Sequence, residues 1–195
     1  IDILLGLIKP QKGQLLIDGR PLTSEQTRAW QNNLGFVPQS IFLSDASIME
    51  NIAFGFPVTE INSERILKVA KLAHLERFIE ELPDGLNTIV GERGVQLSGG
   101  QRQRIGIARA LYCDVNVLVL DEATSALDGI TESQVMDAIY DFSGRKTILI
   151  IAHRITTVKK CDIIYFMKQG KVVDSGPYSE LVERNESFRK MATNI

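Results

Sequence analysis

The sequence is short of the residues that mark several large classes of protein. It contains two cysteines in 195 residues, and Cys113 and Cys161 lack the close spacing of a metal site. So few cysteines favour a reducing, cytoplasmic setting over a disulfide-stabilised fold. No apolar run approaches the roughly 18 residues that cross a bilayer. We therefore expect any role at a membrane to come through a partner or through a segment outside these residues.

An excess of positive charge is also missing. Lysine and arginine number 22 against 24 aspartates and glutamates, which gives a formal net charge of −2. This balance gives no support to a nucleic-acid partner. The hydrophobic fraction of 44% and the charged fraction of 24% are ordinary for a globular protein. A chain of this length forms about one domain, with a core that buries roughly 70% of its unfolded surface.

What the sequence does have is concentrated between residues 97 and 128. Ser98 is a good helix N-cap, and Gly99 and Gly100 after it let backbone N–H groups approach a ligand, so the helix begins as an anion site. Apolar residues recur at helical spacing and give this helix a buried face; they are Ile105, Ala108, Leu111 and Tyr112. We expect the helix to end near residues 113–114.

An apolar run over residues 115–120 predicts a central strand covered on both faces, and Asp121 and Glu122 follow it directly. In open α/β sheets, ligands bind beyond the carboxyl ends of the strands. One carboxylate there can hold Mg²⁺ and a second can deprotonate a water molecule. A simpler interpretation also stands: the glycine pair is a turn, and the carboxylates cap a further helix at residues 123–127.

Two more predicted strands end in polar residues. Gln39 follows a strand over residues 34–37, and His153 follows a strand over residues 147–151. In a parallel sheet, His153 lies at the same edge as Asp121 and Glu122. Taken locally, Gln39 is a polar loop residue and His153 a structural hydrogen bonder.

The other expected elements follow from periodicity and turn residues. We expect helices over residues 1–10, 24–33, 47–53, 60–82 with a break near His74, 131–142 and 178–195; a strand over 14–18; and a hairpin of 162–167 with 171–175, added to one end of the sheet.

Taken together, LSGGQ at residues 97–101, VLVLDE at 117–122 and SALD at 125–128 resemble the nucleotide-binding domain of ATP-binding-cassette (ABC) proteins. Residues 45–54 and TIVGERG at 88–94 resemble the exporter type. The resemblance implies an α/β, P-loop NTPase-like fold: a mostly parallel sheet flanked by helices, with an inserted helical subdomain at about residues 45–110. Residues 1–195 would form one such domain.

The resemblance also implies ATP and Mg²⁺ and assigns roles to single residues. Glu122 would be the general base, His153 would contact the γ-phosphate, and Gln39 would reach the metal and the attacking water. The remaining implied roles are metal binding by Asp121, ATP binding from the opposite subunit by Ser98, Gly99, Gly100 and Gln101, and signalling across the interface by Asp128.

The sequence contains no P-loop of the form G-x-x-G-x-G-K-[ST], and the resemblance places Ile1 one or two residues after that motif. We therefore expect a domain that lacks its N-terminal part. Residues 1–195 alone should have little or no ATPase activity. The apolar face of residues 1–8 should be exposed and should promote association.

In that family the partners would be a second nucleotide-binding domain, head to tail in a homodimer, and a fused or separate transmembrane domain. This places the chain at the cytoplasmic face of a membrane, the inner membrane in a bacterium. The function would be export or flipping, with lipids or lipid-linked saccharides suggested and peptides or drugs open. Alternatives are a soluble ABC ATPase, although no coiled-coil insertion or basic arm is visible, and a non-catalytic regulatory module.

Overall fold

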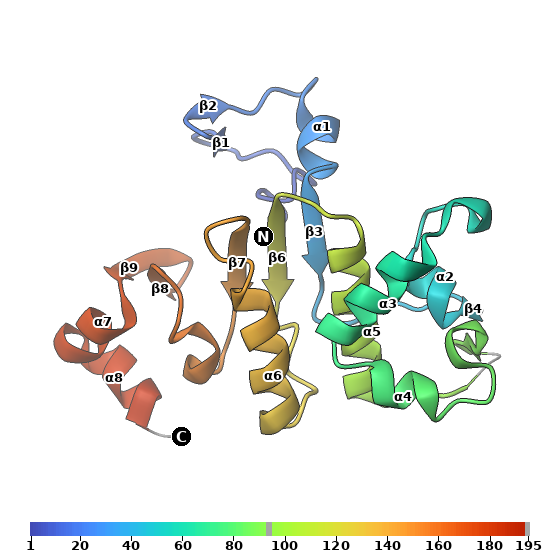
Figure 1. Cartoon of the computed structure of the whole chain (residues 1–195). Coiled ribbons are helices and arrows are strands. Elements are labelled where there is room, and N and C mark those ends of the chain that lie inside the picture. Colours follow the sequence, from blue (N-terminus) through green and yellow to red (C-terminus); the bar gives the residue numbers. More distant parts are fainter. Residues whose placement is uncertain (93–94, 194–195) are drawn as a thin grey trace.

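A three-stranded parallel sheet lies at the centre of the chain. The structure is a computed structural model that describes residues 1–92 and 95–193. The strands β3 (Leu34–Val37), β6 (Val117–Asp121) and β7 (Thr147–Ile151) pair in the order β3-β6-β7 (Figure 1). The predicted α/β fold with a parallel sheet is therefore confirmed.

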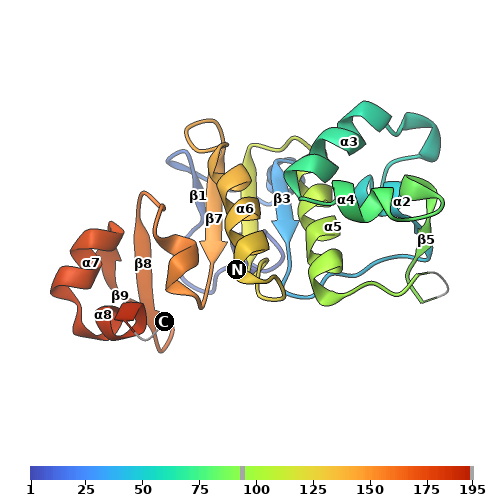
Figure 2. The same ribbon diagram turned by 60° about the horizontal axis from the view of Figure 1, so that its bottom comes forward.

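β6 is buried on both faces, as its unbroken apolar sequence predicts. One face, through Leu118 and Leu120, joins the main core with α5 (Gly99–Tyr112) and α6 (Gly129–Tyr140). On the other face, Val117 and Val119 pack with Leu5 in a smaller cluster. Figure 2 shows α6 over β6 and β7 with α5 beside β3. The two helices thus cover one side of the sheet.

Short elements gather around α5 on the side away from β7 (Figure 1). The helices α2, α3 and α4 share the main core with α5, and the first two of them pack directly on it. The bounds are β4 (Ala46–Ser47), α2 (Ile48–Ile52), η1 (Val58–Glu60), α3 (Ser63–Leu72), α4 (Glu76–Glu80), η2 (Gly85–Asn87) and β5 (Ile89–Val90). The extent of the helical subdomain, residues 45–110, stays a prediction. Of the expected exporter loop at 88–94, residues 93–94 lie outside the described residues.

Two local signals in this region are confirmed. Ser47 caps α2 in a capping box with Glu50. The helical stretch over residues 60–82 is broken near His74, whose φ of +52° takes the backbone out of the helix. His74 is exposed, as a boundary residue should be.

The C-terminal part has a core of its own, formed by Ile155, Ile164, Leu181 and Phe188. Its elements are η3 (Ile155–Val158), β8 (Ile164–Lys168), β9 (Lys171–Gly176), α7 (Tyr178–Arg184) and α8 (Glu186–Thr193). The predicted hairpin is present. Within the described residues, however, β8 and β9 pair only with each other and do not extend the parallel sheet.

Two predicted helices are wrong, one in the C-terminal part and one at the beginning of the chain. The helix expected over residues 178–195 is two helices, because Asn185 leaves the helical conformation and its side chain accepts a hydrogen bond from Phe188 N. Residues 1–8 form turns instead of a helix, since Gly6 adopts a φ of +68°. Within these turns Leu5 is buried, whereas Leu7 and Ile8 are exposed.

The suggested helix at residues 123–127 is also absent. Ser125 N donates to Glu122 O at 3.1 Å and Leu127 N to Thr124 O at 3.0 Å. These are turn hydrogen bonds between residues three apart. The segment therefore runs as successive turns from β6 to α6.

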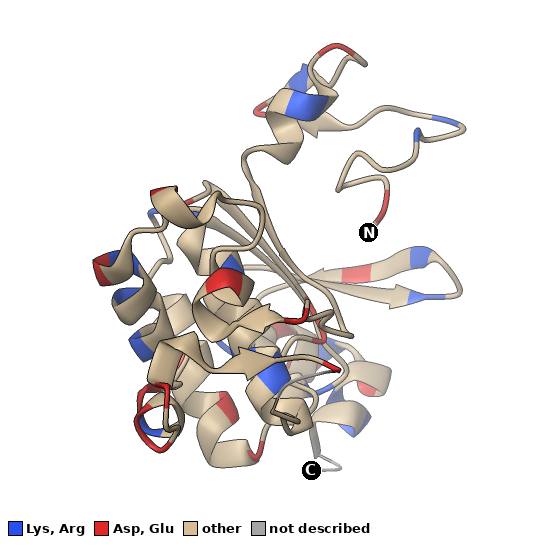
Figure 3. Cartoon of the chain, turned by 90° about the vertical axis from the view of Figure 1, so that its right-hand side faces the viewer, with Lys and Arg blue, Asp and Glu red and all other residues tan. Residues whose placement is uncertain are grey.

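Near the start of the chain, the expected elements are shorter than predicted. β1 (Leu16–Ile17) pairs antiparallel with β2 (Arg20–Pro21), and α1 covers Thr27–Gln31. No helix among the described residues is long and apolar enough to cross a bilayer. Along the ribbon in Figure 3, acidic and basic residues are interspersed.

The close packing of β3 on α5 generates a stability prediction. A Cβ at Gly35 would lie 2.9 Å from the Ala110 carbonyl oxygen, which is backbone and cannot rotate away. Gly35→Ala should destabilise the fold by about 1–3 kcal/mol through overpacking. Gly129→Ala is the control: nothing lies within 4 Å there, and alanine favours the helix. Urea unfolding of both variants checks this, and equal midpoints would contradict it.

Candidate functional site

The site begins where β6 ends. Beyond the last residue of the strand, Glu122 N still donates to Ile151 O at 2.9 Å, so the ladder with β7 continues for one more bond. The Glu122 backbone then enters the left-handed region with a φ of +48°. This conformation costs a non-glycine residue of order 1 kcal/mol. Strain of this kind is frequent at functional sites.

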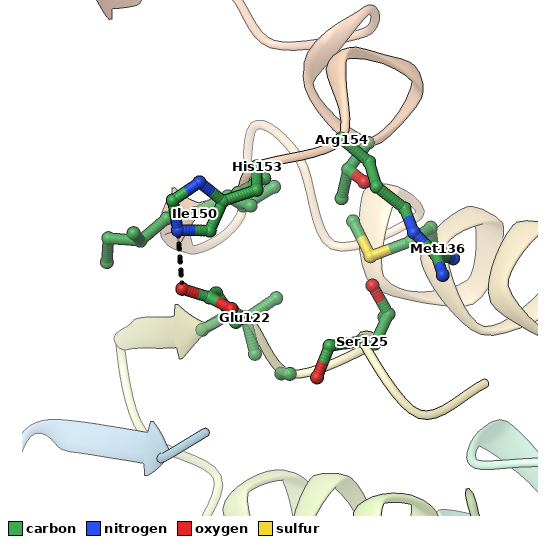
Figure 4. A pocket seen from close by; sticks show the side chains of 12 residues that line it. Glu122, Ser125, Met136, Ile150, His153 and Arg154 are labelled. Atoms are coloured by element: carbon green, nitrogen blue, oxygen red, sulfur yellow. Dashed lines mark ion pairs between the residues drawn. The ribbon is translucent and has the colours of Figure 1, made fainter. Parts of the chain in front are cut away.

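The Glu122 carboxylate is held between two side chains from the loops that follow the neighbouring strands β3 and β7. His153 Nε2 lies 2.8 Å from Oε1, an ion pair when the imidazole is protonated (Figure 4). Gln39 Nε2 donates to Oε2 at 3.0 Å. The Glu122 side chain is 20% exposed and that of His153 82%. The structure therefore brings the three predicted catalytic residues together, within reach of a ligand from solvent.

Asp121 is the last residue of β6 and pairs in register with Ile151. The bond from Gln39 to Glu122 uses the amide nitrogen of Gln39 and not its carbonyl oxygen. Mg²⁺ at phosphoryl-transfer sites takes one or two carboxylates and completes its shell with phosphate and water. An Asp121 carboxylate and a Gln39 carbonyl oxygen fit that donor set. Among the described residues, no group of three or more His, Cys, Asp or Glu is placed to hold a metal without a substrate.

The glycine-rich start of α5 is a capping box. Ser98 Oγ accepts from Gln101 N at 3.2 Å, and Ser98 N donates to Gln101 Oε1 at 2.8 Å. A Cβ at Gly99 would lie 3.2 Å from Ala126 Cβ, and one at Gly100 would lie 3.2 Å from Ala126 O. Both glycines thus allow the turns after β6 to pack closely on the helix. In the contacts of the described residues, these four predicted ATP-binding residues do not join the Glu122 cluster.

Asp128 caps α6. Its Oδ1 accepts from Ile130 N at 3.1 Å and from Thr131 N at 3.0 Å, and Thr131 Oγ1 donates to its Oδ2 at 2.7 Å. These bonds, the one from the Thr131 backbone first, hold the pKa of the Asp128 carboxyl below its usual value. The local role of Asp128 is therefore a helix cap, and its role across an interface stays a prediction.

Sequence reasoning missed Gln103. This side chain is buried on α5, donates to Ser125 Oγ at 3.0 Å and accepts from Ala126 N at 2.9 Å. It ties the glycine-rich helix to the turns after Glu122. In the structure Ile107, four residues later, is buried as well, but Gln103 does not belong to the helical face predicted from the apolar spacing, so no sequence pattern marked it.

A second missed group surrounds Glu132 on α6. Arg154, which the sequence analysis does not single out, donates from Nη1 to Glu132 Oε2 at 2.6 Å. Thr124 Oγ1 and Thr157 Oγ1 both donate to Glu132 Oε1, at 2.9 and 3.0 Å. Arg154 and His153 both line a cavity of about 140 Å³ beside Glu122. In Figure 4 the His153 side chain reaches Glu122, whereas Arg154 extends toward α6.

A parallel sheet with a carboxylate, a glutamine and a histidine at one edge, beside a glycine-rich helix start, defines an α/β nucleotide-binding domain. Comparison with known proteins identifies the family to which this domain belongs. The family model described as ABC transporter matches residues 1–125, and this chain belongs to the ABC transporter family. A bacterial Atm1-family ABC exporter with ATP bound has the same fold, with a TM-score of 0.91 and 34% identity over 98% of this chain and 33% of its own.

Similar sequences include a flippase and a multidrug transporter. An ATP-dependent lipid A-core flippase from Alcanivorax borkumensis is 43% identical over 93% of this chain and 31% of its own length. The multidrug resistance ABC transporter ATP-binding and permease protein of Lactococcus lactis is 40% identical over 97% of this chain and 32% of its own. This chain thus spans about a third of the length of these relatives.

The cap at Asp128 predicts a pH dependence. Because the folded-state pKa lies below the unfolded one, the unfolded chain binds the proton more readily. The stabilisation is present above the unfolded pKa and is lost as the pH falls through the folded pKa. Asp128→Asn keeps a good N-cap without a titrating group. The stability of the wild type relative to this variant should therefore fall between about pH 5 and pH 2. Urea midpoints measured across this range check it; a constant difference would contradict it.

Proposed function

We propose that this chain forms the hydrolytic part of a nucleotide-binding domain in an ABC exporter. It binds and hydrolyses Mg-ATP at a head-to-tail dimer interface and so drives export or flipping of a substrate across a membrane. The observation that carries the proposal is the Glu122 carboxylate held by His153 at 2.8 Å and by Gln39 at 3.0 Å. Three strand ends converge on one group suited to activate water.

In the proposed reaction Glu122 takes a proton from the water that attacks the γ-phosphate of ATP. The bonds from His153 and Gln39 orient the carboxylate before the substrate arrives, so less reorganisation is needed during the reaction. His153 is largely exposed and can then donate to a γ-phosphate oxygen. Mg²⁺ bound by Asp121 and Gln39 would neutralise charge on the phosphates.

The start of α5 would act on the ATP of the opposite domain. Backbone N–H groups at a helix N-terminus favour an anion, and glycines at positions 99 and 100 leave room for it. Ser98 Oγ accepts a hydrogen bond from Gln101 N, and its own hydroxyl proton remains available for a phosphate oxygen. Because residues 1–195 contain no P-loop, each site needs a P-loop from elsewhere. A polypeptide of these residues alone should not turn over ATP.

The cargo and location are proposed from the relatives. A lipid A-core flippase and a multidrug transporter are both at least 40% identical to this chain. An amphipathic cargo, such as a lipid or a lipid-linked saccharide, is consistent with both names. The partners would be a second nucleotide-binding domain and a transmembrane domain, which places the chain at the cytoplasmic face of a membrane.

The central test uses Glu122→Gln in the longer protein that includes a P-loop. The amide keeps the shape of the side chain but cannot take a proton, so ATP turnover should fall by roughly a hundredfold or more. Light scattering should still show dimers that form with Mg-ATP. Glu60→Gln, on the exposed η1 helix, is the matched control and should keep wild-type turnover.

Two outcomes would overturn the proposal. Undiminished turnover in Glu122→Gln would remove the assigned base. A monomer at every ATP concentration, with no turnover in the wild type, would favour a regulatory ABC module.

A further inference from the structure

Glu132 is a buried acid outside the group of residues assigned to the reaction. It is 8% exposed and lies in the first turn of α6. Burying a carboxylate is costly unless its oxygens are paired. Here Oε2 is paired with Arg154, and Oε1 accepts from Thr124 and Thr157. Both oxygens of the carboxylate thus accept hydrogen bonds, and all three partners belong to other segments.

Those segments carry Glu122 and His153, the two residues that contact each other at the candidate site. Thr124 lies two residues after Glu122, in the turns that follow β6. Arg154 and Thr157 belong to the segment that begins with His153 after β7. Glu132 therefore connects the loop that carries the carboxylate with the loop that carries the imidazole.

Near His153, the second loop is also held by Ile155, whose buried side chain packs in the C-terminal core. The His153 side chain is 82% exposed and its one recorded contact among the described residues is with Glu122. Arg154 follows it directly and points to the opposite side, toward α6 (Figure 4). Thr157 is held a second time, because Tyr140 on α6 donates a hydrogen bond to its carbonyl oxygen. The position of the imidazole thus depends on the residues next to it.

We propose that Glu132 is a positioning residue, which holds His153 against Glu122 by binding Arg154, Thr124 and Thr157. The relevance of this contact to ATP hydrolysis rests on the function proposed above, whereas the contact itself does not. Removing the charge of Glu132 leaves the Arg154 guanidinium without its anion. The histidine loop then loses its ionic attachment to the buried carboxylate of α6, and the imidazole is expected to move away from Glu122.

The chain offers a direct probe, because His74 and His153 are its two histidines. Imidazole Cε1–H signals in a two-dimensional NMR spectrum of the 195-residue chain report on each of them. Glu122→Ala removes the carboxylate together with any hydrogen-bonding atom at this position, and it gives the chemical shift expected for an unpaired His153. Glu132→Gln should change the His153 chemical shift by at least half of the difference between the wild type and that reference variant. The His74 signal, on the far side of α5, should not move.

Asp137→Asn is the matched control. Asp137 also lies on α6 and binds the same segment, through Lys160 Nζ at 2.6 Å, but both side chains are more than half exposed. An exposed pair contributes little. The His153 signal should therefore stay at its wild-type position, which separates loss of the buried Glu132 carboxylate, whose partner Arg154 is half exposed, from a general loss of charge between the two segments.

A stationary His153 signal in Glu132→Gln, with a lowered Tm, would show a purely structural role and overturn the proposal. If Glu132→Gln does not fold, as loss of the dispersed His74 signal would reveal, Arg154→Lys decides. It keeps the charge but not the reach and fork of the guanidinium. It should shift the His153 signal in the same direction, and an unmoved signal would overturn the proposal.

Kinetics on the longer protein complete the test. Glu132→Gln should lower kcat roughly ten- to a hundredfold, as a small misplacement of a reacting group does, and leave the KM for ATP unchanged. A raised KM with full kcat would contradict positioning. If Glu122→Gln keeps full turnover, the proposed function fails, while the NMR result still decides whether Glu132 places His153.

Discussion

β6 pairs in parallel with β3 on one side and with β7 on the other, and the site depends on this pairing. Parallel strands end at a common edge, so Gln39 and Glu122 meet although they are 83 residues apart. The backbone bond from Glu122 N to Ile151 O extends the ladder past the strand and fixes where the chain turns. Core packing on both faces of β6 holds that register, and the register decides where the carboxylate lies.

The sequence predicted this edge because each part of it has a local pattern: a buried strand followed by a particular polar residue. It did not predict Gln103 or Glu132. A glutamine and a glutamate on a helix are ordinarily solvated. The hydrogen-bond partners of Glu132, which include Thr124 and Arg154, come from segments that no local sequence pattern connects to Glu132. At residues 1–8 a local pattern misled the prediction, because it indicated a helix that the chain does not form. Its apolar residues suit a helix, but Gly6 takes a left-handed conformation.

Gly99 and Gly100 show that a packing role and a ligand role need not exclude each other. Both lie against Ala126, where an added Cβ would make a tight contact of 3.2 Å. The same absence of side chains leaves the first N–H groups of α5 open to an anion. The capping box adds to this, since it fixes the start of the helix and, among the described residues, uses the Ser98 hydroxyl as an acceptor.

The turns between β6 and α6 are held from two sides. On the α5 side, Gln103 bonds to Ser125 and Ala126, and Ala126 fits against Gly99 and Gly100. On the α6 side, Glu132 binds Thr124. Close-packed contacts of this kind transmit displacements because they leave no free volume to absorb them. A shift of the start of α5 is therefore expected to move the loop that carries Glu122. In the proposed dimer, that would link the phosphate bound by one domain's helix to the base that serves the other nucleotide.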